Sequence, residues 1–167
     1  IAANRTARSA AFVAAGLIVA GLMVLTFCQV CRWRDTETLF AHTLAVSPRS
    51  ALAHKVLGLD YAKRGDYPTA LRHFESANDL DARDRDNAFN LGTALLNLNR
   101  PDEAIPWLNA AIAKYGKPAD AFTNLGRALL QKNMLTEAKA HFTKALELAA
   151  NQSEARINLG IAEGLLG

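Results

Sequence analysis

Cysteine, aromatic residues and unbalanced charge are all scarce in this chain. Two cysteines among 167 residues exclude a small fold built on several disulfide bridges. With 19 basic and 16 acidic residues, the net charge is only +3, and no basic tract is interleaved with aromatics. We therefore expect no nucleic-acid partner. Half of the residues are hydrophobic, with only ten glycines and five prolines, so a disordered chain is excluded as well.

Motifs that carry catalytic chemistry are missing too. The sequence has no glycine-rich phosphate loop, no HExxH zinc motif, and no serine or cysteine with a base nearby in sequence. The four histidines are spread over different predicted helices: His42, His54, His73 and His141. We therefore expect no catalytic residues, no metal site, no cofactor and no enzymatic activity in this chain.

The two cysteines form a CxxC pair, Cys28 and Cys31, which leaves two interpretations open. A haem-attachment motif needs histidine at the next position, where Arg32 stands, and a zinc site would need two further ligands. One remaining interpretation is a redox pair, and the other is two small apolar residues in a packed helix. The missing ligands favour the second interpretation.

The longest stretch without charge extends from Ser9 to Cys31. At about 1.5 Å per residue, a helix over this stretch is about 35 Å long, enough to cross a hydrocarbon layer of about 30 Å. We predict a single transmembrane helix at about 9–31 within a membrane anchor of residues 1–34. Lipid would surround residues 9–33, with Trp33 at the interface. A buried core helix and a signal peptide are the alternatives, although no small-x-small cleavage site follows the stretch.

Charge does not determine the orientation of this span in the membrane. Two arginines precede the span and two follow it: Arg5, Arg8, Arg32 and Arg34. The first residue is Ile rather than Met, so we expect either a processed chain or a piece of a longer protein. The identity of the partner and the oligomeric state are likewise open.

The rest of the chain repeats itself at a fixed interval. A Leu-Gly pair begins at Leu57 and returns at Leu91, Leu125 and Leu159. Two rows of alanine and one row of large apolar residues keep the same step. Their members are Ala70, Ala104 and Ala138; Ala77, Ala111 and Ala145; and Phe74, Leu108 and Phe142. Each unit has the pattern of two amphipathic helices joined by a short turn.

From about Asp35 to its end, the chain resembles the tetratricopeptide-repeat family, whose helix–turn–helix units recur every 34 residues. The resemblance implies an all-α fold in which a tetratricopeptide solenoid follows the transmembrane helix. It divides the chain into a half repeat (35–50), three full repeats and a terminal helix (153–167). The full repeats are 51–84, 85–118 and 119–152.

The turn inside each full repeat holds a glycine or an asparagine, at Gly65, Asn99 and Asn133. Both residue types tolerate the left-handed backbone conformation that ends a helix. We also expect the small residues at the recurring glycine and alanine positions to let the paired helices approach closely.

An asparagine precedes three of the four Leu-Gly pairs, at Asn90, Asn124 and Asn158. These positions resemble the asparagine ladder on the concave face of some tetratricopeptide arrays, where side-chain amides hold the backbone of an extended peptide. A carboxamide suits this task because it both donates and accepts hydrogen bonds. The alternative is that neighbouring helices satisfy these amides. By the same geometry we expect a protein-binding groove bordered by Lys55, Asp86, Phe89, Thr93, Asp120, Thr123, Arg127 and Glu154.

Two functions from different classes are consistent with these features. The first is a membrane-anchored scaffold that binds a protein or an extended peptide, as an accessory or assembly subunit of a membrane complex. Other transmembrane subunits are then further candidate partners. The second is the C-terminal tail of a polytopic glycosyltransferase-like membrane protein, in which the repeats bind the acceptor protein.

The second function depends on the run WRDTETLF, residues 33–40. It resembles the junction before the repeats in bacterial membrane-bound mannosyltransferase-like proteins that carry tetratricopeptide tails. The resemblance implies that the repeats lie on the periplasmic side of a bacterial inner membrane. A clamp for a peptide carboxylate, another binding mode of the tetratricopeptide family, needs several basic residues in the groove. Only Lys55 and Arg127 qualify.

Overall fold

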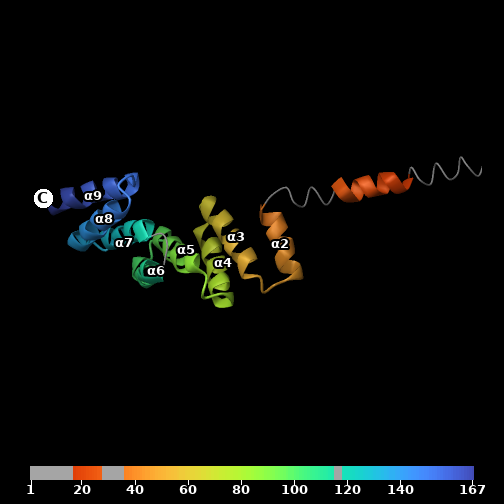
Figure 1. Cartoon of the computed structure of the whole chain (residues 1–167), viewed down its shortest axis with the longest axis horizontal. Coiled ribbons are helices and arrows are strands. Elements are labelled where there is room, and N and C mark those ends of the chain that lie inside the picture. The colour runs from red at the N-terminus through yellow and green to blue at the C-terminus, as the bar shows by residue number, and fades with distance from the viewer. Residues whose placement is uncertain (1–16, 28–35, 115–117) are drawn as a thin grey trace, which may run out of the picture.

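The computed structural model describes residues 17–27, 36–114 and 118–167, and every regular element within them is a helix (Figure 1). One helix covers residues 17–27. The others are α2 (Thr36–Val46), α3 (Ala51–Lys63), α4 (Tyr67–Leu80), α5 (Arg85–Asn97), α6 (Pro101–Lys114), α7 (Pro118–Gln131), α8 (Leu135–Leu148) and α9 (Ser153–Leu166).

The helices from α2 to α9 follow one another along an array whose order in space is their order in sequence (Figure 1). Each helix packs on its neighbours in the chain, and the odd-numbered helices α3, α5, α7 and α9 also contact one another in turn. One face of the array is therefore built from odd-numbered helices alone. The predicted all-helical solenoid is confirmed over these residues.

The two helices of a pair meet where a glycine on the first helix faces a large apolar side chain on the second. A Cβ built at Gly58 would lie 2.5 Å from the ring of Phe74. At Gly126 the corresponding distance to the ring of Phe142 is 2.6 Å. Only glycine fits at such a distance, so the expected close approach of the paired helices is confirmed. Gly92 and Leu108 form the third contact of this kind.

The recurring alanines lie in the same interior as these contacts. All six are almost completely buried, and the large apolar residues beside them are at most 1% exposed. A larger side chain at any of these positions would force strain into a closely packed core. The alanines are Ala70, Ala104, Ala138, Ala77, Ala111 and Ala145.

The turns inside the pairs have the left-handed conformation expected from their residue types. Gly65 has φ of 83°, Asn99 has φ of 57° and Asn133 has φ of 59°. The amide that follows each of these residues donates to a carbonyl in the last turn of the helix, for example Asp66 to Tyr61 at 2.9 Å. This bond and the left-handed residue together form a Schellman cap, which satisfies carbonyls at the end of the helix.

The N-terminal apolar run is described only in part. Residues 17–27 form a helix with exposed apolar side chains, among them Leu17 at 70% and Phe27 at 69%. Among the described residues, no helix has the length and apolar character needed to cross a membrane. The rest of the predicted span, 9–16 and 28–31 with its cysteine pair, lies outside the described residues.

The last helix, α9, differs from α3, α5 and α7 because the glycine at its repeat position, Gly160, has no facing side chain. A Cβ at Gly160 would meet nothing within 4 Å. Apolar side chains of this helix are exposed at Ile157, Ile161, Leu165 and Leu166. Gly160 therefore shares the register of the packed glycines without their steric constraint.

This contrast predicts opposite effects for one substitution at two positions of the same register. Gly126→Ala should lower the free energy of unfolding by about 1–3 kcal/mol, because its Cβ collides with Phe142. Gly160→Ala should leave it unchanged or raise it by up to about 1 kcal/mol, because alanine favours the helix. Urea unfolding followed by circular dichroism measures both, and equal effects would contradict the steric account.

Two half-buried histidines occupy the same position of their helices, two repeats apart. His73 on α4 stacks on Tyr61, with ring centroids 5.6 Å apart, and its Nδ1 lies 3.0 Å from Nδ1 of His54. His141 on α8 stacks on Phe122 at 5.7 Å. Both imidazoles are therefore packed between the helices of a pair.

Burial lowers the pKa of both rings below the ordinary value of 6.5. At His73 the nearby His54 and Arg72 lower the pKa further. At His141 the carboxylate of Glu137 opposes the effect of burial on the pKa without cancelling it. Protonation therefore disfavours the folded state at both positions.

Stability should consequently depend on pH in the mildly acidic range. Well above pH 6.5 both histidines are neutral in the folded and unfolded states, and their full contribution to stability is present. As the pH falls below that value the unfolded chain takes up protons first, so the free energy of unfolding should decrease. Urea unfolding at pH 7.5 and pH 5.5 measures the difference. This difference in the free energy of unfolding should shrink in a His73→Gln and His141→Gln double variant. It should persist after His42→Gln, a change at an exposed site.

Candidate functional site

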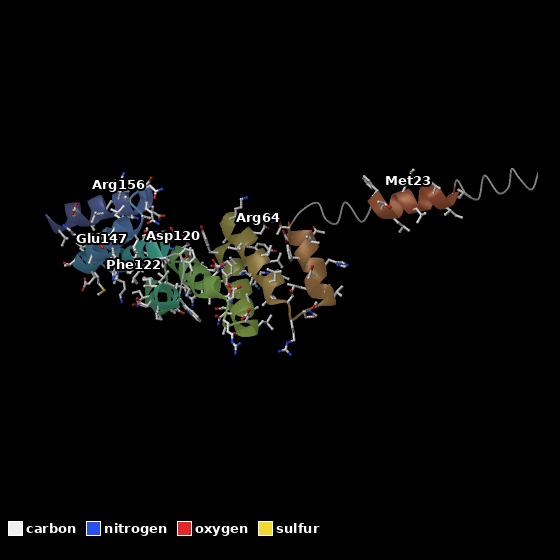
Figure 2. The ribbon with its side chains drawn as sticks, viewed as in Figure 1. Met23, Arg64, Asp120, Phe122, Glu147 and Arg156 are labelled. Carbon is white, nitrogen blue, oxygen red and sulfur yellow. The ribbon has the colours of Figure 1, made fainter. Side chains whose placement is uncertain are left out.

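A hollow of about 320 Å³ opens on the face built from odd-numbered helices, between α5, α7 and the start of α9. Figure 2 labels Asp120, one of its lining residues, near the N-terminal end of α7. Six residues predicted to border the groove line this hollow: Phe89, Thr93, Asp120, Thr123, Asn124 and Arg127. Glu154, which was also expected to border the groove, lines the hollow as well, together with Gln152 and Ser153.

The side-chain amide of Asn124 lies at the centre of the polar contacts in this hollow. Its Nδ2 donates to Oγ1 of Thr93 at 2.9 Å, and its Oδ1 accepts from Nη1 of Arg127 at 3.2 Å. The residue is 6% exposed, so these two bonds hold the carboxamide in one orientation. One N–H and one lone pair of the amide remain available to a ligand.

A second set of bonds ties α7 to the chain just before α9. The hydroxyl of Thr123 lies 2.6 Å from Oε1 of Gln152, to which it donates. The amide Nε2 of Gln152 in turn donates to Oδ1 of Asp120 at 2.5 Å. Arg127 also reaches across, to the carboxylate of Glu154 at 3.2 Å. The wall of the hollow is therefore a network of polar side chains from α7, from α9 and from the loop that precedes α9.

The residues that sequence reasoning missed as groove residues, Gln152 and Ser153, lie at the end of the loop before α9 and at its first position. A signal for Gln152 was present in the register of the repeat. Asp84 stands two repeats before Gln152 and also directly precedes an odd-numbered helix, α5. Its carboxylate accepts a hydrogen bond from Lys55 on α3, a residue predicted to border the groove. The residue just before α5 and the residue just before α9 therefore both contact groove-side residues.

Four predicted residues do not line the hollow: Lys55, Asp86, Asn90 and Asn158. Lys55 on α3 instead forms ion pairs toward the start of α5, with Asp84 at 2.5 Å and Asp86 at 4.0 Å. Burial alone would raise the pKa of Asp84, but hydrogen bonds from Lys55 and from the amide of Asp86 outweigh it and lower that pKa. The ammonium group of Lys55 is thus occupied by carboxylates.

Asn90 has a different environment from Asn124, although both occupy the same repeat position. It is 9% exposed, and its side chain makes no hydrogen bond with any residue that the structure describes. Asn124 donates to Thr93, which lies on the preceding odd-numbered helix. The residue equivalent to Thr93 one repeat earlier, and so the one that would serve Asn90, is Leu59, whose alkyl side chain offers no acceptor. Asn158 is half-buried and likewise has no side-chain hydrogen bond within the described part of the chain. Neighbouring helices therefore satisfy one of the three ladder amides and not the other two.

Within the described ranges, no group of three or more histidine, cysteine or carboxylate residues could hold a metal ion. The cysteine pair lies outside these ranges. The described part of the groove therefore offers hydrogen bonds and charge rather than a metal centre.

Comparison with known families identifies the repeats. Residues 55–122 and residues 119–152 match two profiles that are each described as tetratricopeptide repeat. Residues 55–152 of the chain are tetratricopeptide repeats. Together the two matches run from α3 to α8, so the repeat domain includes most of the face on which the hollow lies.

Solved tetratricopeptide domains share this fold. The first domain of Spaghetti (RPAP3), bound to the HSP90 peptide SRMEEVD, is 28% identical with a TM-score of 0.65, over 70% of this chain and 92% of that one. The second domain of human RPAP3, in complex with the HSP70 peptide SGPTIEEVD, is 26% identical with a TM-score of 0.62, over 68% and 94%. YrrB, described as having an unusual peptide-binding site, is 25% identical with a TM-score of 0.67, over 84% and 72%.

Other comparisons bear on the remaining expectations. Among curated proteins, none matches this sequence. The matches give no support to the resemblance between residues 33–40 and mannosyltransferase-like proteins. The tetratricopeptide part of the sequence interpretation is thus shown, and the glycosyltransferase part is not.

Proposed function

We propose that the tetratricopeptide array is a docking module that holds an extended segment of another protein along its face of odd-numbered helices. The observation that carries the proposal is the amide of Asn124, which Thr93 and Arg127 orient at the wall of the hollow. An amide held in this way offers one donor and one acceptor to a peptide group without selecting its side chain. The module binds and takes no part in a chemical step.

The amides of Asn90 and Asn158 extend the same row by one repeat in each direction. Because neither side chain has a hydrogen-bond partner among the described residues, each can offer its full capacity to a bound backbone. The amide atoms of both side chains reach solvent, so a bound peptide would replace their hydrogen bonds to water with bonds to its backbone. The complexes of the two RPAP3 domains with HSP90 and HSP70 peptides support this use of the fold.

The proposal predicts that loss of two ladder amides weakens binding without unfolding the array. Peptides selected from a random displayed library on the full chain would be measured against the Asn90→Ala and Asn124→Ala double variant. Two lost hydrogen bonds of about 1 kcal/mol each correspond to roughly 30-fold weaker binding. Asn109→Ala, on an exposed face of α6, is the matched control and should bind as the parent does.

Circular dichroism of the double variant should show unchanged helicity, which separates a binding defect from unfolding. If the library yields no binding peptide, or if selected peptides bind the double variant as tightly as the parent, the groove does not hold peptides through this ladder.

The second part of the proposal is that this module is attached to a membrane by its N-terminal run, as an accessory or assembly subunit of a membrane complex. Residues 9–31 carry no charge, which is the observation that favours it. By the resemblance at residues 33–40, the repeats would lie on the periplasmic side of a bacterial inner membrane. The alternative is that the chain is the tail of a polytopic glycosyltransferase-like protein and binds the acceptor there.

Membrane attachment predicts the behaviour of the chain on fractionation. The full chain should stay with bacterial membranes after washing at alkaline pH and should need detergent for release. A variant without residues 1–31 should be released by the wash. Release of the full chain would contradict the anchor, and protease digestion of spheroplasts would show on which side the repeats lie.

The size of the native polypeptide separates the two membrane roles. An antibody raised against the repeats would detect a band near 18.0 kDa for a separate scaffold subunit. A band several times heavier would indicate the tail of a polytopic protein.

A further inference from the structure

We infer that this groove selects basic peptide segments, rich in lysine or arginine, over acidic tails of the kind bound by the RPAP3 domains. The inference rests on the proposed peptide-binding function and names the chemistry of the ligand. Three observations carry it: the charges along the face, their pairing, and the apolar wall of the hollow.

Carboxylates recur along the groove with the period of the repeat. Asp86, Asp120 and Glu154 occupy the same position of successive repeats and lie in the first turns of α5, α7 and α9. They form an acidic row, which runs beside the asparagine row along the same helices. Asp120 and Glu154 both line the hollow. A carboxylate in a first turn also favours the helix, but that effect does not require the side chain to face the groove.

The two basic residues predicted to border the groove, Lys55 and Arg127, do not balance this row, because both already hold acidic partners. Lys55 pairs with Asp84 at 2.5 Å and with Asp86 at 4.0 Å. Arg127 pairs with Glu154 at 3.2 Å and also bonds to Asn124. With Asp120, these groove residues comprise four carboxylates and two cations, so the six together carry net negative charge.

Asp120 is the carboxylate best placed to meet a cation of the ligand. Its contact within the described residues is a neutral one, the amide of Gln152 at 2.5 Å, and it forms no ion pair there. The bond to Gln152 uses Oδ1, which leaves Oδ2 for a ligand. Phe89 on the same hollow adds an apolar wall, against which the methylene stem of a lysine or arginine can pack.

The peptides of the two RPAP3 complexes have the opposite charge requirement. SRMEEVD and SGPTIEEVD both end in two glutamates, a valine and an aspartate. To bind such a tail, a groove needs cations that its own carboxylates do not already occupy. Here the acidic row would repel the tail, and its approach would compete with the existing ion pairs of Lys55 and Arg127.

The test compares two labelled peptides of equal length on the full chain in detergent, by fluorescence anisotropy. One is SRMEEVD and the other is SRMKKVK with an amidated C-terminus. We expect the basic peptide to bind at least tenfold more tightly, with an affinity that falls as salt is added. The double variant Asp86→Asn and Asp120→Asn should weaken the basic peptide severalfold and reduce the preference. Asp79→Asn, which removes one exposed carboxylate from α4, should change neither.

The outcomes separate the charge preference from the docking function. Tighter or equal binding of SRMEEVD would overturn the preference while leaving docking intact. A basic preference that persists unchanged in the Asp86 and Asp120 double variant would also overturn it, because the acidic row would not be its cause. If neither peptide binds, the docking function fails and the preference fails with it. Circular dichroism of the variants excludes unfolding as the cause of any loss.

Discussion

The close contact between a glycine of one helix and a large apolar side chain of the next is the constraint on which the rest of this array depends. With its Cβ absent, Gly58 lets the ring of Phe74 lie against the backbone of α3. The same contact recurs at Gly92 and Gly126, so the three pairs pack in one way. Since the pairs are alike and successive, their odd-numbered helices come into contact and form a single face. The groove is a consequence of that packing.

The side chains on this face carry the recognition chemistry, and their roles differ between repeats. Asn124 is held by the hydroxyl of Thr93 on the preceding odd-numbered helix. One repeat earlier the position of Thr93 is occupied by Leu59, and Asn90 has no such bond within the described residues. One amide is therefore oriented in advance, and another reaches solvent without a side-chain partner among the described residues. A bound backbone would take the place of water at the second amide.

The acidic row on the same face has a different origin from the asparagine amides. First turns of helices favour acidic residues, and the carboxylates of the acidic row occupy such turns while also bordering the groove. Lys55 and Arg127 are the cations that sequence reasoning assigned to ligand contact, and the structure shows both engaged by carboxylates at or just before the start of the next odd-numbered helix. This pairing changes the sign of the charge that a ligand meets.

The sequence by itself determined the period, the helix pairs and the left-handed turns, because each is a local property or a repeated one. Burial at Phe142 and the positive φ of Asn133 follow from a register that can be read without coordinates. Only the tertiary structure decided which groove residues gather in one hollow, which amide is held, and which cations are already paired. The part played by Gln152 was missed for this reason. These outcomes depend on contacts between side chains far apart in the sequence, whose distances follow from the packing of whole helices.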